Sequence, residues 1–281
     1  MGLARGHAAG MQRLEVAGVE LEVQVEGTGE PVVLIHGGAL SGFLSPLASE
    51  PALAEDHQVI SYRRLGYGGS SPARGDVEIA DQAAQCLALL RHLDVERAHV
   101  VGHSSGAMIA LQLAHDAPDS VATLALLELP DFQQPSSADF GQAVLGPAFG
   151  QYGGGDRAGA VDAFLGGLSG PTHWEAAKRA LPPGALDQAT ADADPFFAVE
   201  APSAQRWSLE EAASGVAAPV LVVMGALSPD VHPVYAEAHE AMLHRFPEAE
   251  SYVLPQATHL LALQNPHDLA AALADFIARH R

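Results

Sequence analysis

The hydrophobic and polar positions of the chain follow two alternating kinds of pattern. Residues 12–26 alternate apolar and polar side chains on either side of Ala17 and Gly18, which predicts an antiparallel strand pair. Five short, nearly continuous apolar runs predict strands that are buried on both faces, as in a parallel sheet. These runs and the last predicted strand lie at residues 31–38, 57–62, 98–104, 121–128, 219–226 and 249–255.

Helical periodicity occurs between several of these strands. Residues 77–94, 105–118 and 266–281 place apolar side chains at helical spacing, and the last segment puts Leu269, Leu273, Phe276 and Ile277 on one face. Buried strands that alternate with helices indicate an α/β fold with a mostly parallel central sheet flanked by helices.

The alternation stops between the sixth and seventh predicted strands. This stretch begins with a segment rich in Gly, Pro and Ser and continues with helical patterns and no strand. A segment this long is unusual as a plain loop in a compact domain. We therefore expect a helical cap over residues 130–205, inserted after the sixth strand, and a core domain built from residues 1–129 and 206–281.

Composition and charge narrow the classes of partner. The chain has 281 residues, 48% of them hydrophobic, and a formal net charge of −20. An acidic protein of this kind is not expected to bind nucleic acid or anionic membranes. It has a single cysteine, Cys86, which excludes an intrachain disulfide framework. Neither a membrane-spanning run nor a secretory signal is evident in the sequence, so we expect a cytoplasmic protein, and a homo-oligomer remains open.

A candidate nucleophile lies where the fifth predicted strand gives way to a helix. Residues 102–106 read Gly-His-Ser-Ser-Gly, so Ser104 is the central residue of a G-x-S-x-G motif. In a strand-to-helix context this motif is typical of a nucleophile elbow, a sharp turn that exposes the serine. The backbone N–H of Ser105 is then expected to serve an oxyanion hole, because helix N-termini present free N–H groups. The alternative is a glycine-rich turn with helix-capping serines.

The second oxyanion donor is expected from an earlier loop. The strand at 31–38 ends in His36, Gly37 and Gly38, and a glycine allows a substrate oxygen to approach its N–H. We assign this donor to Gly38. We expect His36 to shape the loop through hydrogen bonds, and His103 to point away from the nucleophile.

The general base is expected late in the chain. Among 14 histidines, His259 lies between the last predicted strand and the last predicted helix, which suits a base that follows the serine in chain order. The remaining candidates lie around the preceding helix: His232, His239 and His244.

The motifs together resemble the α/β-hydrolase superfamily. The resemblance rests on "VVLIHGG", "YRRLGYGGSSP", "VVGHSSGA", "PVLVVMGA" and "ATHLLALQNP", which occur in order across essentially the whole chain. It implies the α/β-hydrolase fold and a serine–histidine–acid triad, and it says little about the substrate.

The acid of this triad departs from the usual pattern of the superfamily. Most members carry an aspartate after the seventh strand, where this chain has Ser228. Glu128 closes the sixth predicted strand, and the "ELP" segment resembles zearalenone lactonases and related esterase-like hydrolases that place the acid there. We assign Glu128 as the acid, with Asp230 as the alternative acid and Asp131 as a weaker one.

These residues predict a serine hydrolase that cleaves a carboxylic ester or lactone through a Ser104–His259–Glu128 triad and an acyl-enzyme. We expect no metal and no organic cofactor, and a small-molecule ester or lactone as the partner. A C–C bond hydrolase or a haloperoxidase-like enzyme with the same triad is an alternative, as is a hydrolase-fold ligand receptor with slow turnover. Aromatic residues of the cap region and its exit are candidates to line the substrate pocket: Trp174, Phe196, Phe197 and Trp207.

Overall fold

A computed structural model describes residues 10–281. The expectation that the chain has no secretory signal concerns its beginning, and the first nine residues lie outside the described part. None of the helices within residues 10–281 is long and apolar enough to cross a membrane.

The core is an eight-stranded sheet with the order β1-β2-β4-β3-β5-β6-β7-β8. Strands β1 and β2 are antiparallel to each other, and β2 is antiparallel to β4, whereas all other neighbours are parallel. The predicted mostly parallel sheet is therefore confirmed. The strands are β1 (Gln12–Val16), β2 (Val19–Glu26), β3 (Glu30–Ile35), β4 (His57–Arg63), β5 (Ala98–His103), β6 (Val121–Leu127), β7 (Val220–Gly225) and β8 (Glu250–Leu254).

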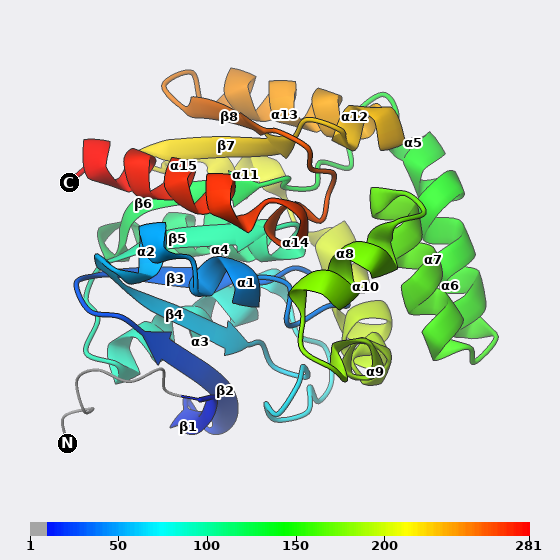
Figure 1. Ribbon diagram of the computed structural model, residues 1–281, viewed down its shortest axis with the longest axis horizontal. Coiled ribbons are helices and arrows are strands. Elements are labelled where there is room, and N and C mark those ends of the chain that lie inside the picture. The colour runs from blue at the N-terminus through cyan, green and yellow to red at the C-terminus, as the bar shows by residue number, and fades with distance from the viewer. Residues whose placement is uncertain (1–9) are drawn as a thin grey trace.

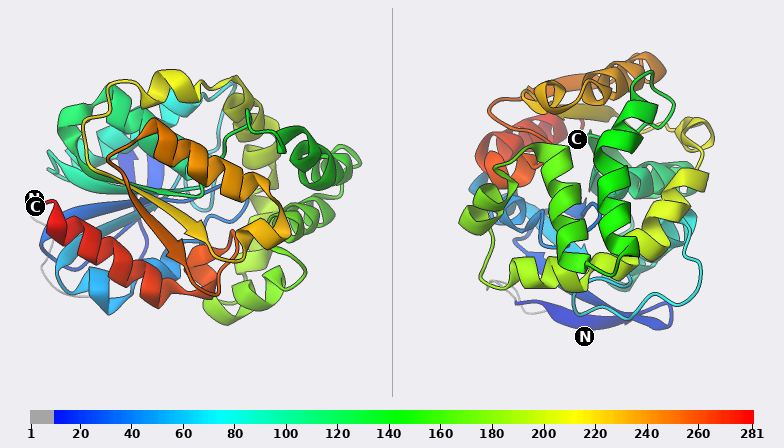
Figure 2. Two further views of the ribbon diagram at one scale, coloured as in Figure 1. Left: turned by 90° about the horizontal axis from the view of Figure 1, so that it is seen from above. Right: turned by 90° about the vertical axis from the view of Figure 1, so that its right-hand side faces the viewer.

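Helices cover both faces of this sheet, which explains the continuous apolar runs of its central strands (Figures 1 and 2). In β3, Val32 and Leu34 belong to one buried cluster and Val33 and Ile35 to the other, as the alternation of strand side chains requires. The first face packs against α1 (Ser45–Ala48), α2 (Pro51–Ala54), α14 (Leu261–Gln264) and α15 (Pro266–Arg279). The second packs against α3 (Ile79–His92), α4 (Ser105–Asp116), α11 (Leu209–Ala213) and α13 (Val234–Arg245).

The segment that follows β6 forms only helices and loops, and it lies beyond the carboxyl ends of the parallel strands (Figure 1). In the second panel of Figure 2, two of its helices run side by side across the end of the molecule. The segment contains α5 (Ser137–Phe140), η2 (Gly141–Leu145), α6 (Gly146–Gly153), α7 (Arg157–Ser169), α8 (His173–Ala180), α9 (Ala185–Ala191), η3 (Pro195–Glu200) and α10 (Ala201–Arg206). Two short elements elsewhere complete the fold: η1 (Pro118–Ser120) and α12 (Ser228–Val231).

Buried polar contacts tie this helical segment, called the cap below, to the core. Asp192 of the cap is 2% exposed and accepts hydrogen bonds from the Ser41 hydroxyl at 2.7 Å and the Gly68 N–H at 3.0 Å. Tyr235 of α13 donates its hydroxyl to the carbonyl of Leu168, near the end of α7, at 3.0 Å. These contacts fix the cap over the carboxyl edge of the sheet, which is where ligands bind in open α/β folds.

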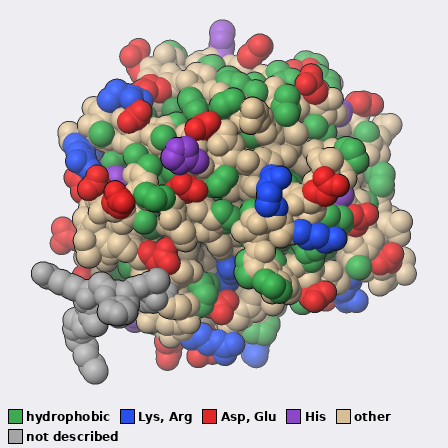
Figure 3. All heavy atoms as spheres, viewed as in Figure 1, with side chains coloured by type: hydrophobic (Ala, Val, Ile, Leu, Met, Phe, Trp, Pro, Cys, Tyr) green, Lys and Arg blue, Asp and Glu red, His purple; other side chains and the backbone are tan. Residues whose placement is uncertain are grey.

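The exterior carries charge of both signs. Figure 3 shows Asp and Glu side chains spread over the visible face, interspersed with fewer Lys and Arg side chains.

Candidate active site

Strand pairing brings the candidate serine and acid to neighbouring strand ends. His103 of β5 pairs with Leu127 of β6, so the next residue of each strand, Ser104 and Glu128, leaves the sheet at the same edge. The pairing continues briefly past both strands, because Ser104 N–H donates to the Leu127 carbonyl at 2.9 Å and Glu128 N–H donates to the Val223 carbonyl at 2.9 Å.

Both residues adopt backbone conformations that residues other than glycine rarely take. Ser104 has φ 54° and ψ −126°, and Glu128 has φ 46°. Such conformations cost of the order of 1–3 kcal/mol each and persist only where the surrounding structure imposes them. Ser104 therefore lies on a strained strand-to-helix turn of the kind that its motif predicts.

Close packing explains the last glycine of the motif. A Cβ atom on Gly106 would lie 2.3 Å from the Ile35 carbonyl oxygen and 2.5 Å from that of His36. The start of α4 can therefore approach the end of β3 only when residue 106 has no side chain. This approach brings the loop of Gly38 next to Ser104, and both residues border a small cavity beside His259.

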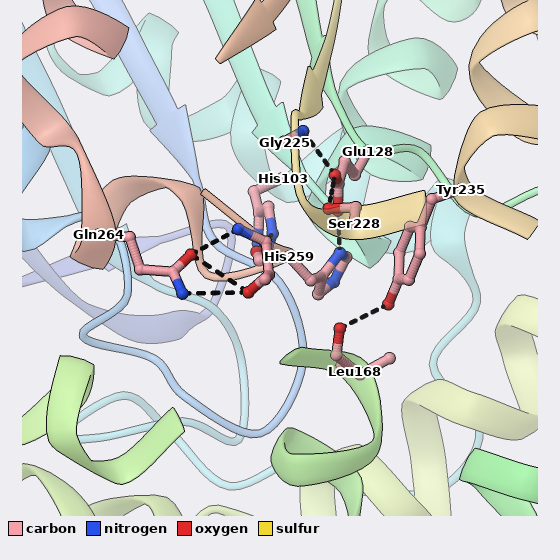
Figure 4. Close-up of polar contacts among 9 residues, drawn as sticks. His103, Glu128, Leu168, Gly225, Ser228, Tyr235, His259 and Gln264 are labelled. Atoms are coloured by element: carbon pink, nitrogen blue, oxygen red, sulfur yellow. Dashed lines mark hydrogen bonds and ion pairs between the residues drawn. The ribbon is translucent and has the colours of Figure 1, made fainter. Parts of the chain in front are cut away.

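His259 and Glu128 form a buried pair. The Nδ1 atom of His259 lies 2.6 Å from Glu128 Oε2, and both side chains are at most 5% exposed (Figure 4). Since the carboxylate can only accept, Nδ1 carries the hydrogen and Nε2 is the basic nitrogen.

The other oxygen of Glu128 is held by residues of the β7 end. Glu128 Oε1 accepts the Gly225 N–H at 2.7 Å and the Ser228 hydroxyl at 2.5 Å. Sequence reasoning treated Ser228 only as the residue that replaces an acid. In the structure, the serine at this position is a hydrogen-bond donor to Glu128, and no local feature of the sequence indicated that contact.

The loop that carries His259 is braced on several sides. Gln264 Oε1 accepts the Thr258 N–H at 2.7 Å, and His103 Nε2 lies 3.0 Å from the His259 carbonyl oxygen, to which it donates. The rings of His103 and Tyr235 lie 4.6 Å and 5.4 Å from the His259 ring. Burial, and then the proximity of His259, hold the pKa of His103 well below its usual range, so His103 is a neutral support.

His36 shapes the loop before the candidate oxyanion glycine. Its Nδ1 lies 2.7 Å from the Gly37 carbonyl oxygen, and its Nε2 accepts the Arg64 N–H at 3.1 Å. Burial, followed by the charge of Arg64, lowers the pKa of His36 well below the usual value. The residue is therefore a neutral structural histidine, as its place in the sequence suggested.

The alternative acids and bases are exposed or have partners outside the triad, although Asp131 and His239 line the same cavity as Ser104. Asp230 is exposed on α12, and Asp131 accepts hydrogen bonds from Gln133 and Gln134. His232 pairs with Asp139, and the Nε2 of His239 lies 2.9 Å from the Ser251 hydroxyl oxygen. His244 is exposed in the last turn of α13.

A largely apolar cavity of about 330 Å³ opens beside Ser104, Glu128 and His259. This volume is at the lower end of the range for small-molecule sites. The core contributes apolar side chains such as Met108, Val222 and Met242, and the cap contributes others. The apolar residues from the cap include Leu145, Phe149, Phe164, Leu168 and Phe196.

Of the four aromatic residues expected to line the pocket, only Phe196 does so. Phe197 stacks on Tyr152 at 4.9 Å, within the cap. Trp174 donates its indole N–H to Asp162, also within the cap, and Trp207 donates to Gln112 on α4 at 2.8 Å. The expectation is corrected for these three residues, because their polar or stacking partners draw them away from the cavity.

The described residues contain no cluster of three or more His, Cys, Asp or Glu side chains arranged to hold a metal ion. The cavity is bordered by a serine and by an imidazole that is paired with a carboxylate.

Comparison with known proteins identifies relatives of this chain. The chain is 39% identical over 142 residues to the dihydrolipoyllysine-residue acetyltransferase component of an acetoin cleaving system from Pseudomonas putida. The matched segment covers 48% of this chain and 35% of that protein. Across the first three curated relatives, the matched segment spans 34–40% of their length.

Several solved structures match nearly the whole chain, among them the following two. The first, Est816, described as an N-acyl homoserine lactone degrading enzyme, has a TM-score of 0.71 and 26% identity, with 94% of this chain and 100% of that one covered. The second, a thermophilic esterase from Thermogutta terrifontis, has a TM-score of 0.75 and 22% identity, with 97% and 100% covered. Residues 30–266 also match the family described as alpha/beta hydrolase fold. By its sequence and its architecture, the chain belongs to the alpha/beta hydrolase family.

Proposed function

We propose that this chain is a cofactor-independent serine hydrolase that cleaves a small carboxylic ester or lactone. Ser104 is the nucleophile, His259 the general base and Glu128 the acid that orients His259. The N–H groups of Gly38 and Ser105 form the oxyanion hole.

In this mechanism the Ser104 Oγ attacks the substrate carbonyl carbon while His259 Nε2 takes the hydroxyl proton. The carbonyl oxygen becomes an oxyanion, which accepts hydrogen bonds from Gly38 and Ser105 N–H. The tetrahedral intermediate expels the alkoxide, and the His259 imidazolium returns its proton to the leaving oxygen. Water, deprotonated by the same nitrogen, then attacks the acyl-enzyme and releases the acid and Ser104.

The observation that carries this proposal is the 2.6 Å contact between His259 Nδ1 and Glu128 Oε2, at a cavity that Ser104 also lines. A buried carboxylate on Nδ1 fixes the tautomer that leaves Nε2 basic and stabilises the imidazolium once it forms. The strained turn at Ser104 and the apolar cavity lend further support. The likeness to a lactone-degrading enzyme at 26% identity favours acyl-oxygen chemistry over other reactions of the fold.

The test combines covalent labelling with turnover. A fluorophosphonate probe should modify Ser104, identified by peptide mass spectrometry, and the protein should hydrolyse some member of a series of p-nitrophenyl esters and lactones of graded acyl length. Ser104→Ala should lower kcat by several orders of magnitude. Ser105→Ala is the matched control and should lose far less, because it keeps its backbone N–H.

Labelling of Ser105 instead of Ser104 would contradict the proposed nucleophile. Tight binding of a ligand with barely measurable turnover would identify a hydrolase-fold receptor instead of an enzyme.

A further inference from the structure

Two carboxylates that the proposed triad does not use line the cavity, Asp131 and Glu200, and both oxygens of Asp131 already accept hydrogen bonds. Glu200, the last residue of η3 in the cap, lines the cavity and is 2% exposed. Its Oε2 accepts hydrogen bonds from the Arg64 guanidinium and from the Tyr67 hydroxyl, both at 2.7 Å. Its Oε1 is buried and has no hydrogen-bond partner among the described residues.

An unpartnered carboxylate oxygen in an apolar wall is unfavourable, because it has lost its water without gaining a donor. Nearly all buried polar atoms have a partner, so an exception beside a candidate active site needs a reason. A ligand with a hydrogen-bond donor would explain the unpartnered oxygen.

The position of Glu200 Oε1 indicates where such a donor would be. It lies 3.2 Å from the point that a Cβ atom on Gly38 would occupy. Gly38 is the proposed oxyanion donor, so the free acceptor lies beside the place where the reacting carbonyl oxygen would bind. We take the donor to be on the substrate atom adjacent to the carbonyl carbon, or one bond further.

The charge balance of the site indicates the chemical class of the donor. Arg64 is 1% exposed, forms an ion pair with Glu200, and also donates to Gln82 and to the Gly37 carbonyl. Since the pair is already neutral, the site offers little attraction to a second cation, which would also lose its hydration in an apolar cavity. A neutral hydroxyl or amide N–H fits better than an ammonium group.

We propose that Glu200 is a specificity-determining residue whose Oε1 accepts a hydrogen bond from a neutral hydroxyl or amide N–H next to the reacting carbonyl. The preferred substrates are then α-hydroxy or α-amido esters and lactones with an apolar remainder. This inference rests on the proposed function, since it takes the reacting carbonyl to bind at Gly38 and Ser104.

The hydroxyl arm of the test compares ethyl 2-hydroxyoctanoate with its 2-methoxy derivative and with ethyl octanoate, using both enantiomers where they exist. The donor-bearing ester should exceed both the larger methoxy ester and the smaller unsubstituted one in kcat/KM, by at least about tenfold. Sites built to hydrogen-bond a substrate group discriminate strongly against analogues that lack it. The amide arm compares N-hexanoyl-α-amino-γ-butyrolactone with its N-methyl derivative and shows which donor the site prefers.

Glu200→Gln keeps the size of the side chain but presents an amide in place of the free carboxylate oxygen. The preference for donor-bearing substrates should fall to about twofold or less. Tyr67→Phe is the matched control: it removes a donor to Oε2 and leaves Oε1 unchanged, so the wild-type preference should remain. Circular dichroism and thermal unfolding establish that both variants are folded.

Ser104→Ala provides a readout that depends neither on turnover nor on the folding of a Glu200 variant. The same ester and lactone pairs should bind it with at least about a tenfold difference in Kd, measured by calorimetry. Equal treatment of donor-bearing and methylated ligands in both assays would overturn the inference, as would an equal loss of preference in Tyr67→Phe and Glu200→Gln.

The two proposals fail differently. If Ser104 is not labelled and no ester is cleaved, the proposed hydrolase function is wrong, while the binding comparison still decides the role of Glu200. If esters are cleaved without regard to the donor, the hydrolase function remains and only the role of Glu200 is lost.

Discussion

Ser228 donates its hydroxyl to Glu128 Oε1 at 2.5 Å, from the position after β7 where most members of this superfamily carry the acid itself. The proposed acid, Glu128, lies instead at the end of β6, and Ser228 holds its carboxylate in place. The Gly225 N–H, 2.7 Å from the same oxygen, completes this arrangement and leaves Oε2 for His259.

Glu128→Gln should lower kcat by roughly 10² to 10⁴, because an amide can accept a hydrogen bond but cannot stabilise the imidazolium through charge. Asp230→Asn is the matched control and should cost about tenfold or less, since Asp230 is exposed on α12. Steady-state kinetics with one ester at one pH suffice for the comparison. If Asp230→Asn lowered kcat strongly while Glu128→Gln stayed near the wild-type value, the acid would be Asp230, after β7, and not Glu128.

Ser228→Ala should lower kcat by about tenfold or less, because a hydrogen bond to a charged group is lost while the Gly225 N–H remains. Ser228→Asp should be worse than Ser228→Ala in the wild-type background, since two carboxylates in contact favour protonation of one of them. In the Glu128→Gln background, the same Ser228→Asp change should raise activity. The four variants assayed together decide this, and a Ser228→Asp protein as active as wild type would show that the two side chains do not interact.

Gly38→Ala should lower kcat/KM by about 10², because the new Cβ would lie 2.2 Å from Cδ2 of Phe196 and the cap or the loop must move. Phe196→Ala in the same protein should recover part of this loss by making room. A double-mutant cycle on kcat/KM measures the coupling. Strictly additive effects would mean that the two residues do not collide and that Gly38 matters for another reason.

The stability of the protein should fall as the pH drops below about 6.5. Burial lowers the pKa of His36 and of His103 well below the usual value, so the unfolded chain binds protons on these residues at a pH where the folded chain does not. Each contributes up to about 1.4 kcal/mol of lost stability between pH 7.5 and 5.5.

His103→Gln should show a smaller loss between these two pH values than the wild type, measured by urea unfolding, because one such histidine is gone and the amide can still donate to the His259 carbonyl. His267→Gln is the matched control, because it makes the same change at an exposed histidine. An identical pH dependence in all three proteins would mean that His103 titrates in the folded state.

The sequence by itself determined much of the fold. The antiparallel pair about Ala17 and Gly18, the buried strands and the face of α15 that carries Leu269 and Phe276 all occur where the hydrophobic pattern predicts them. Local chemistry explains this success: strand and helix periodicities and the glycines of the turn at Ser104 act over a few residues, so they are visible in a single segment. The same short range makes the strand-to-helix turn at Ser104 recognisable from five residues.

Only the tertiary structure decided which distant groups meet. Glu128 and His259 are 131 residues apart, Glu128 and Ser228 are 100 apart, and Arg64 and Glu200 are 136 apart. Such contacts depend on strand order and on how the cap folds back over the sheet, which no local pattern encodes. The same limit explains why the expectation that Trp174 and Trp207 line the cavity is wrong. An aromatic side chain suits a pocket or a packed surface equally well, and in this protein the position of its hydrogen-bond acceptor, Asp162 or Gln112, decides between the two.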